Sequence, residues 1–255
     1  MPKFAANLSM MFNEHPFLDR FQAAAESGFT AVEYLFPYDH PAETVAARLK
    51  DAGLVQALFN MPAGDWASGE RGFAALPGRE ADFAAALEKA IDYARIIGTP
   101  LLHMMAGIAP ADDPAAIATY RKNLKLAADK TGEAGIGLVI EPINRRDMPG
   151  YFLNDFDQAV GFIEAIAQSH VKLQFDVYHR QILHGDVTMA LRKFAHLIGH
   201  IQIASVPLRN EPLTGELDDR RIFAEIDAIG YTGYVGCEYR PAGETRQGLT
   251  WMQQI

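Results

Sequence analysis

The chain has 255 residues, with 23 lysines and arginines against 32 aspartates and glutamates, so its formal net charge is −9. This charge argues against nucleic acid or an anionic membrane as the partner, because both require a protein that supplies positive charge. Hydrophobic residues make up 49% of the chain, which is enough for a large core and excludes a disordered protein.

Cysteine content and hydropathy indicate the cellular compartment. Cys237 is the only cysteine, which excludes an intrachain disulfide and a cysteine-rich zinc site. The first residues lack the apolar run of ~7–15 residues that a secretory signal contains. No stretch approaches the ~20 apolar residues of a membrane span. We therefore expect a cytoplasmic protein.

Short runs rich in β-branched and aromatic residues alternate along the chain with longer amphipathic segments. In chain order, the runs predict strands at residues 4–8, 31–36, 54–59, 100–105, 137–141, 171–176, 199–203 and 234–238. Apolar residues at i, i+3 and i+4 predict helices at residues 16–27, 41–52, 79–97, 114–134, 156–168, 187–194, 216–229 and 243–254.

The regular alternation of strands and helices indicates the fold class. Each strand–helix unit has about 32 residues, the size of a βα repeat in a parallel sheet, and no linker or low-complexity segment interrupts the series. The pattern predicts an α/β protein with a single (β/α)8 TIM barrel, and one domain covering residues 1–255. An open, doubly wound sheet is the alternative, but no glycine-rich nucleotide-binding loop follows the first strand.

Two connections, residues 60–78 and 142–153, are longer than the others. Both follow predicted strands, which places them at the C-terminal end of the barrel. Long loops at this end are typical of active-site walls or lids. Trp66, Phe73, Tyr151 and Phe152 support this interpretation, because large aromatic side chains are unfavourable in solvent.

Side chains with an oxygen end each of the last four predicted strands: Glu141, Asp176, Gln202 and Glu238. In a TIM barrel these strand ends meet at one mouth. Three converging carboxylates repel one another unless a cation lies between them. Oxygen ligands with a summed charge of −3 favour Mg²⁺ or Mn²⁺ over zinc or copper. A single acid at a strand end is usually the start of a solvated loop, but four in succession indicate a metal site.

Glu141 and Glu238 also predict a reaction. They end strands on opposite sides of the mouth, so they can flank a substrate. A metal that holds a ketone oxygen and the neighbouring hydroxyl makes the C–H bond between them acidic. One carboxylate then removes the proton, and the other, or the same one, returns it to the adjacent carbon. The sequence therefore predicts an isomerase or an epimerase.

Three further residues are candidates for substrate binding. His179 lies three residues beyond Asp176, His103 ends the fourth predicted strand, and Arg209 follows the seventh. A guanidinium such as that of Arg209 can hold a substrate carboxylate through two hydrogen bonds. The alternatives are a surface histidine at the next helix for His179 and a hydrogen-bonded core histidine for His103.

The segments that carry these residues resemble a known family. They are GFTAVEYLFPYD, LLHMMAG, GLVIEPINRRDMPGYFL, QFDVYH, GHIQIASVPLRNEPLTGE and YVGCEYRPAGET. Over essentially the whole chain, the sequence is similar to the hydroxypyruvate isomerase family, including its 2-oxo-tetronate isomerase branch, in the xylose-isomerase-like barrel superfamily. The resemblance implies a metal-assisted isomerase without an organic cofactor. Its substrate would be a small 2-keto-3-hydroxy acid, converted to the aldehyde or 3-keto isomer.

The resemblance also implies roles for individual residues. Glu141 and Glu238 would be the catalytic pair, and these two would bind the metal together with Asp176 and Gln202. Ketose 3-epimerases of the same superfamily are the main alternative. They have a histidine in place of Gln202, so this difference favours the hydroxypyruvate isomerase branch over them. A non-catalytic sugar-acid-binding barrel and an endonuclease IV-like phosphodiesterase are weaker alternatives, the latter because it needs many histidine ligands. Assembly into a homo-oligomer is compatible with the sequence.

Overall fold

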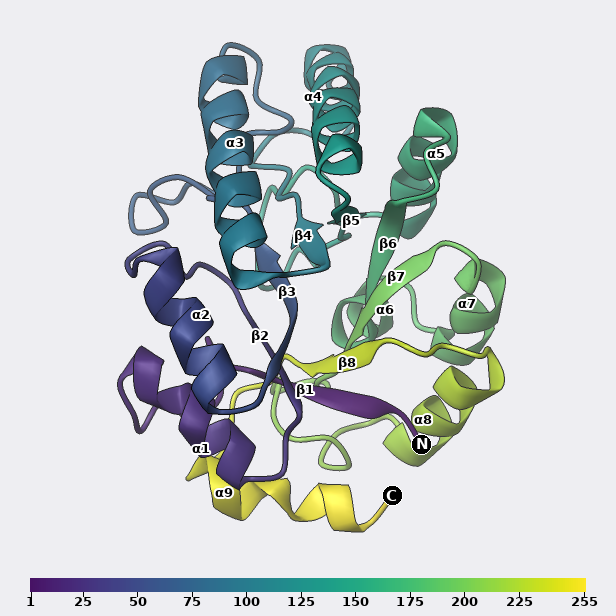
Figure 1. The fold of residues 1–255 in the computed structure, drawn as a ribbon. Helices are drawn as coiled ribbons and strands as arrows, with labels where there is room; N and C mark the ends of the chain where they lie inside the picture. The colour runs from purple at the N-terminus through teal and green to yellow at the C-terminus, as the bar shows by residue number, and fades with distance from the viewer.

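The computed structural model describes residues 1–255 and confirms the TIM barrel. Eight parallel strands form a closed barrel in which each strand pairs with the next and β8 pairs with β1, which excludes the open sheet (Figure 1). The strands are β1 (Lys3–Asn7), β2 (Ala31–Tyr34), β3 (Val55–Asn60), β4 (Leu101–His103), β5 (Gly137–Ile140), β6 (Val171–Asp176), β7 (Ile198–Gln202) and β8 (Tyr234–Cys237).

Helices surround the barrel (Figure 1). They are η1 (Phe17–Asp19), α1 (Arg20–Glu26), α2 (Ala42–Asp51), α3 (Glu80–Ile97), α4 (Pro114–Glu133), α5 (Phe156–Ile166), α6 (Val177–Leu183), α7 (Val187–Phe194), α8 (Asp219–Ala228), α9 (Thr245–Gly248) and η2 (Leu249–Gln253). An ion pair between Arg246 and Glu26 joins α9 to α1. No helix has both the length and the apolar character needed to cross a membrane.

Local sequence signals set the ends of several helices. Asp113 accepts a hydrogen bond from the backbone N–H of Ala115, and Pro114 occupies the first position of α4. Gly98 ends α3 in the left-handed conformation, with φ of 72°, which a residue with a Cβ rarely adopts. At these two ends, the start of α4 and the end of α3, the observed boundaries are the predicted ones.

The two faces of the strands have different side chains. Phe4 packs edge-on against Phe223 of α8 and Trp251 of η2, which lie outside the barrel. Because side chains alternate along a strand, Ala5 points into the barrel. There it forms a separate small cluster with Ala31 and Ala57. These small residues leave space for polar side chains in the barrel interior.

The helix α6 was not predicted. It begins directly after β6, and the Asp176 carboxylate caps it by accepting hydrogen bonds from the backbone N–H groups of Tyr178 and His179. No predicted helix covers His179, whereas the structure places it in the first turn of α6. The C-terminal segment also differs from the prediction, because it forms the two short helices α9 and η2 instead of one.

Candidate active site

A cavity of about 870 Å³ opens at the C-terminal ends of the strands. Both long loops form its walls, as predicted: residues 60–78 contribute Trp66, and residues 142–153 contribute Ile143, Asp147 and Met148. Trp66 packs against Phe36, with the two rings tilted by 52°, and lies beneath the guanidinium of Arg71, so it is held in place. Five of the predicted site residues also line the cavity: His103, Glu141, His179, Arg209 and Glu238.

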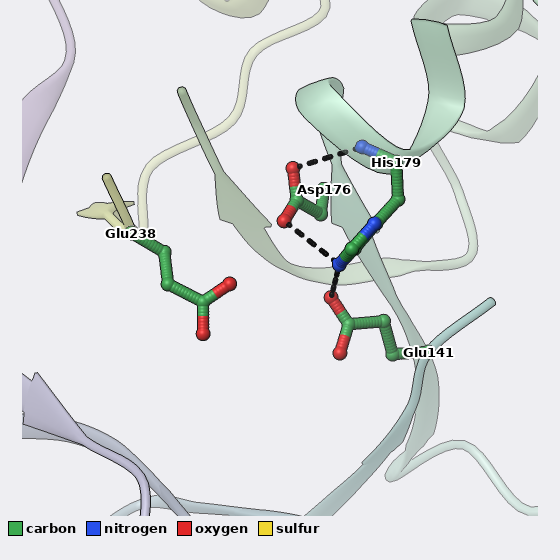
Figure 2. Close-up of side chains that lie close together, drawn as sticks. All are labelled: Glu141, Asp176, His179 and Glu238. Carbon is green, nitrogen blue, oxygen red and sulfur yellow. Dashed lines mark hydrogen bonds and ion pairs between the residues drawn. The ribbon is translucent and has the colours of Figure 1, made fainter. Parts of the chain in front are cut away.

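Four buried side chains converge at the bottom of the site. Glu141 follows β5, Asp176 ends β6, His179 belongs to α6, and Glu238 follows β8. One potential ligand atom from each lies within 4.8 Å of those of the other three (Figure 2). We call these four residues the carboxylate cluster. Glu141 Oε1 and Asp176 Oδ2 are buried and have no hydrogen-bond partner, so they are free to bind a ligand.

The environment of the cluster disfavours negative charge. Burial raises the pKa of Glu141 well above its usual range, and the nearby Glu238 and Asp176 carboxylates raise it further. Burial also raises the pKa of Glu238, to about 8, against the opposing effect of Arg209. The Asp176 pKa is raised by burial as well, while Arg209 again opposes the shift. The three carboxyl groups therefore hold protons more tightly than free carboxyl groups do, and a bound cation would oppose this effect.

His179 presents an N–H group to the cluster. Burial, followed by the charge of Arg209, lowers its pKa well below the usual range, so the ring is neutral. Its Nδ1 faces the backbone N–H of Asn144 at 3.4 Å, and a backbone N–H can only donate. The ring proton therefore lies on Nε2, which is 3.6 Å from Asp176 Oδ2 and 4.0 Å from Glu141 Oε1. This arrangement suits a hydrogen-bond donor to substrate.

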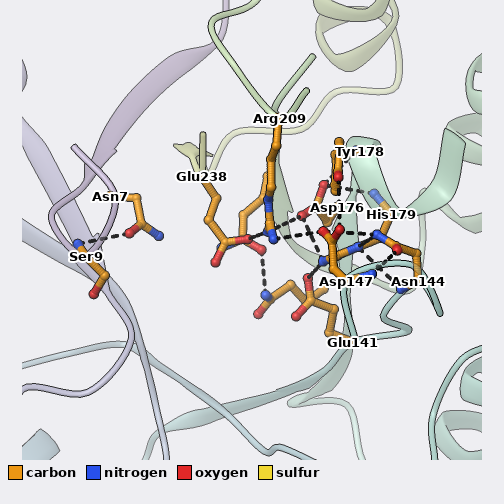
Figure 3. A network of polar contacts seen from close by, with 12 residues as sticks. Asn7, Ser9, Glu141, Asn144, Asp147, Asp176, Tyr178, His179, Arg209 and Glu238 are labelled. Atoms are coloured by element: carbon orange, nitrogen blue, oxygen red, sulfur yellow. Dashed lines mark hydrogen bonds and ion pairs between the residues drawn. The ribbon is translucent and has the colours of Figure 1, made fainter. Parts of the chain in front are cut away.

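Arg209 lies between carboxylates. Its guanidinium contacts Glu238, lies 3.7 Å from Asp176 Oδ2 and donates to Asp147 Oδ2 at 3.3 Å (Figure 3). Burial alone would lower its pKa, but these three carboxylates and that of Glu141 outweigh burial and raise it. The prediction treated Arg209 as a free clamp for a substrate carboxylate. In the structure its charge is already paired.

His103 and Gln202 occupy different positions relative to the cavity. His103 lines it, and burial with the nearby His200 lowers the pKa of its ring to about 3. Both of its ring nitrogens lack a hydrogen-bond partner, so it is not the hydrogen-bonded core histidine of the alternative interpretation. Gln202 is buried and does not line the cavity. Its amide donates to Glu33 and accepts from Gln174.

Asp147 and Tyr178 belong to the site but were not predicted. The Tyr178 hydroxyl donates to Asp147 at 3.3 Å, and the Tyr178 ring lies beneath the Arg209 guanidinium (Figure 3). Asp147 lies in the middle of the 142–153 loop, where no strand end marks it. Tyr178 lies in the helix α6, which the periodicity did not reveal.

The donor set is suited to a hard divalent cation. Buried carboxylate oxygens with unused lone pairs, grouped within the span of one coordination sphere, are the ligands that Mg²⁺ and Mn²⁺ prefer. His179 directs its N–H, and not a lone pair, toward this group. The three carboxylates are therefore the ligands that the observed geometry favours.

Comparison with known proteins identifies close relatives. The family model described as xylose isomerase-like TIM barrel matches residues 21–255. A 2-oxo-tetronate isomerase of Cupriavidus necator is 54% identical over 255 residues, covering 99% of this chain and 98% of that protein. A hydroxypyruvate isomerase of Escherichia coli is 43% identical over 254 residues, covering 99% and 98% of the two chains.

Solved structures show the same architecture. A crystal structure from Brucella melitensis described as AP endonuclease, family 2, has a TM-score of 0.97 and 48% identity, covering 100% of this chain and 99% of that one. A 3-keto-D-glucoside 4-epimerase of E. coli has a TM-score of 0.82 over the full length of both chains. At 22% identity, that likeness shows the fold alone.

Proposed function

The chain belongs to the xylose isomerase-like TIM barrel family and, within it, to the family of hydroxypyruvate and 2-oxo-tetronate isomerases, and from this premise we propose its reaction. It is an isomerase, and its substrate is a small 2-keto-3-hydroxy acid of the hydroxypyruvate or 2-oxo-tetronate type. The product is the aldehyde or the 3-keto isomer. The relatives' names supply this substrate class, and the site supports the chemistry.

The carboxylate cluster is the observation that carries the proposal. Glu141 and Glu238 follow strands on different sides of the barrel, yet their oxygens approach within 4.8 Å. The raised pKa of Glu238, about 8, lies close to neutral pH. A carboxylate with such a pKa can both accept and return a proton under physiological conditions.

Glu141, Asp176 and Glu238 would hold a divalent cation, Mg²⁺ or Mn²⁺, with Gln202 as the further ligand that the family resemblance implies. A cation bound there polarises the carbonyl and hydroxyl oxygens of the substrate. No organic cofactor is needed, because the reaction moves protons within one molecule.

The two glutamates move the proton. One of them takes the C–H proton from the hydroxyl-bearing carbon C3, which leaves an enediolate. The other, or the same one, delivers a proton to C2, while the hydroxyl proton of O3 passes to O2. The bonds balance, since one C–H bond breaks and one forms, and no electrons leave the substrate.

Histidines around the cluster orient the substrate in this proposal. The Nε2–H group of His179 points to where a substrate oxygen would lie, between Glu141 and Asp176. His103 Nε2 lies 3.8 Å from Glu141 Oε2 and has no other partner. Both rings are neutral because burial lowers their pKa, so they can donate without adding positive charge.

The cavity does not favour a phosphodiesterase. A nucleic-acid backbone needs several free cations. Arg209 and Arg240 are the only lysines or arginines in the lining, which also contains Glu14, Asp147 and two cluster glutamates. An epimerase using the same enediolate remains the closer alternative. It would keep the keto group on its carbon and invert the neighbouring centre.

The test is an assay of the purified full chain with hydroxypyruvate and with 2-oxo-tetronate, after chelation and with added Mg²⁺ or Mn²⁺. NMR in deuterium oxide would follow the product and solvent deuterium on carbon. We expect metal-dependent movement of the carbonyl group with deuterium incorporation. Inversion at a carbon without movement of the carbonyl would favour the epimerase. Absence of any deuterium exchange would favour a non-catalytic binding protein.

A further inference from the structure

A second group of buried polar side chains lies inside the barrel, and it does not line the cavity. Its members are Asn7 of β1, Glu33 of β2, and His200 and Gln202 of β7. Each is at most 2% exposed. We call them the Glu33 cluster. Glu33, at its centre, has no part in the reaction proposed above.

The Glu33 carboxylate is fully hydrogen-bonded. Its Oε1 accepts from Asn7 Nδ2 at 2.9 Å and from Gln202 Nε2 at 2.8 Å, and its Oε2 lies 2.6 Å from His200 Nε2. These contacts connect β2 to β1 on one side and to β7 across the barrel. A buried carboxylate with such partners is held in one orientation.

The barrel interior has space for the Glu33 side chain because a neighbouring strand residue is glycine. Gly236 of β8 pairs with Gln202 of β7, and a Cβ atom at Gly236 would overlap the Glu33 side chain. Glycine at this position therefore provides the space for Glu33. The small side chains of Ala5 and Ala31 lie in the same part of the interior.

Glu33 also determines which way the Gln202 amide points. A carboxylate accepts hydrogen bonds, so the amide nitrogen of Gln202 faces Glu33 and the amide oxygen faces away from it. That oxygen accepts from Gln174 Nε2 at 2.6 Å. Gln202 is paired in register with Asp176, so its side chain extends from the sheet beside the carboxylate cluster.

From these contacts we infer that Glu33 is a positioning residue, which holds the Gln202 amide with its oxygen toward the carboxylate cluster. The inference rests on the proposed cation site, because an amide binds a hard cation through its oxygen. Without a carboxylate at position 33, the amide is free to turn its nitrogen toward the cation. The Gln174 amide is oriented in the same way, with its nitrogen toward its neighbour, since it donates to the Gln202 oxygen.

The experiment measures Mn²⁺ binding to the full chain by electron paramagnetic resonance, independently of activity. Glu33→Gln replaces the acceptor by an amide that imposes no direction. We expect its Mn²⁺ affinity to fall about 10- to 100-fold, as for other residues that orient metal ligands. The double variant E33Q/Q202E restores an acceptor beside the cation and a donor at position 33. Its affinity should return to within about threefold of the wild type, since its charge is also conserved.

Glu225→Gln is the matched control. Glu225 is another buried carboxylate, but it pairs with Arg192 between α8 and α7, so its variant should bind Mn²⁺ normally. Unchanged affinity in E33Q would overturn the inference. Weak Mn²⁺ binding in both E33Q and the double variant would show that Glu33 has only a general structural role, and would also overturn the inference. If the wild type binds no Mn²⁺, the proposed cation site fails first, and the inference fails with it.

A separate observation concerns Arg240, which also lines the cavity. Arg209, the other arginine there, is paired with three carboxylates. Arg240 is exposed, and its side chain forms no ion pair or hydrogen bond, although its backbone N–H donates to Arg209. It is therefore the one strong cation in the lining with its charge unpaired. Building on the proposed function, we infer that Arg240 binds the carboxylate of the substrate and determines the specificity for acids.

Arg240→Gln tests this assignment by comparing two three-carbon ketones. Hydroxypyruvate carries a carboxylate where dihydroxyacetone carries a hydroxymethyl group. We expect KM for hydroxypyruvate to rise about tenfold or more, the loss of one charge-assisted contact, with kcat within about threefold. The KM or inhibition constant of dihydroxyacetone should stay within about twofold. Arg221→Gln, on the outer surface of α8, is the control.

An unchanged KM for hydroxypyruvate, or an equal rise for both ketones, would overturn the role of Arg240. A wild type that isomerises neither hydroxypyruvate nor 2-oxo-tetronate would contradict the proposed function itself. The two failures are therefore distinguishable in the same set of assays.

Discussion

The Glu33 cluster and the carboxylate cluster lie in the same barrel, but their buried carboxylates differ in hydrogen bonding. The oxygens of Glu33 have three partners, whereas Glu141 Oε1 and Asp176 Oδ2 have none. Burial does not distinguish the groups, because Glu33 and Asp176 are each 1% exposed. The difference lies in whether the protein itself satisfies the charge. The hydrogen bonds of the Glu33 cluster stabilise the barrel, whereas the carboxylate cluster has oxygens without partners that are available to a bound ligand.

The largest expected effect is the loss of activity in the carboxylate cluster. Glu141→Gln and Glu238→Gln each remove a proton acceptor while keeping the side-chain shape. We expect kcat to fall about 10²- to 10⁴-fold in each, measured in the isomerase assay, with circular dichroism showing a folded protein. Glu225→Gln, which changes a carboxylate outside both clusters, should keep wild-type kcat. Near-normal activity in both cluster variants would show that the glutamate pair does not perform the chemistry.

The second expected effect is stabilisation by metal, which only the carboxylate cluster should show. Mn²⁺ at about 100 times its dissociation constant should raise the free energy of unfolding by about 3 kcal/mol. In Asp176→Asn the gain should be much smaller, because the variant loses one carboxylate ligand. Differential scanning calorimetry after chelation, with and without Mn²⁺, measures both. An equal gain in wild type and variant would place the cation elsewhere.

The third prediction is that Glu→Gln changes the free energy of unfolding in opposite directions at positions 33 and 141. In the metal-free protein, Glu33→Gln replaces an acceptor that faces three donors, and should lower the free energy of unfolding by about 2 kcal/mol. Glu141→Gln removes a carboxyl group whose ionised form is disfavoured by burial and by the nearby Glu238 and Asp176 carboxylates, which raise its pKa, and should therefore increase the free energy of unfolding. Urea unfolding at pH 7 with a chelator measures both. Shifts of the same sign would remove the distinction between the clusters.

The sequence predicted the barrel because each strand is a short apolar run followed by an amphipathic segment, and this order determines the topology. Strand ends also identified Glu141, Asp176 and Glu238, since every parallel strand delivers its last residue to the same mouth. The helix α6 was missed because its seven residues are too short for a helical period to show, although Asp176 is a good capping residue.

Other features depend on contacts between distant segments and were beyond prediction. The pairing of Glu33 with His200 joins residues 167 positions apart, and nothing local to either residue indicates it. The carboxylates that pair with Arg209 come from the end of β6 and from the connections after β5 and β8. Sequence position alone therefore suggested a free cation at 209 and gave no reason to single out Arg240.

The smallest expected effect is a dependence of stability on pH that arises from the carboxylate cluster. Burial raises the pKa of Glu238 to about 8, from 4.5 in the unfolded chain. Between these values the native state binds more protons than the unfolded state, so the free energy of unfolding falls as pH rises. His103 and His179 act in the opposite direction, because burial lowers their pKa, but only below about pH 6.5, where the unfolded rings still bind protons.

The window in which the carboxylates act alone is therefore pH 6.5 to 8. Over it, we expect the free energy of unfolding of the metal-free protein to fall, with Glu238 alone contributing about 1–2 kcal/mol, from the 1.4 kcal/mol that roughly one pKa unit represents. Urea unfolding at several pH values with a chelator measures this slope. Glu238→Gln should reduce it, and saturating Mn²⁺ should abolish it, because a bound cation lowers the pKa values of its ligands. Glu33→Gln should leave it in place, and a slope that disappears in this variant instead would assign the titration to the wrong cluster.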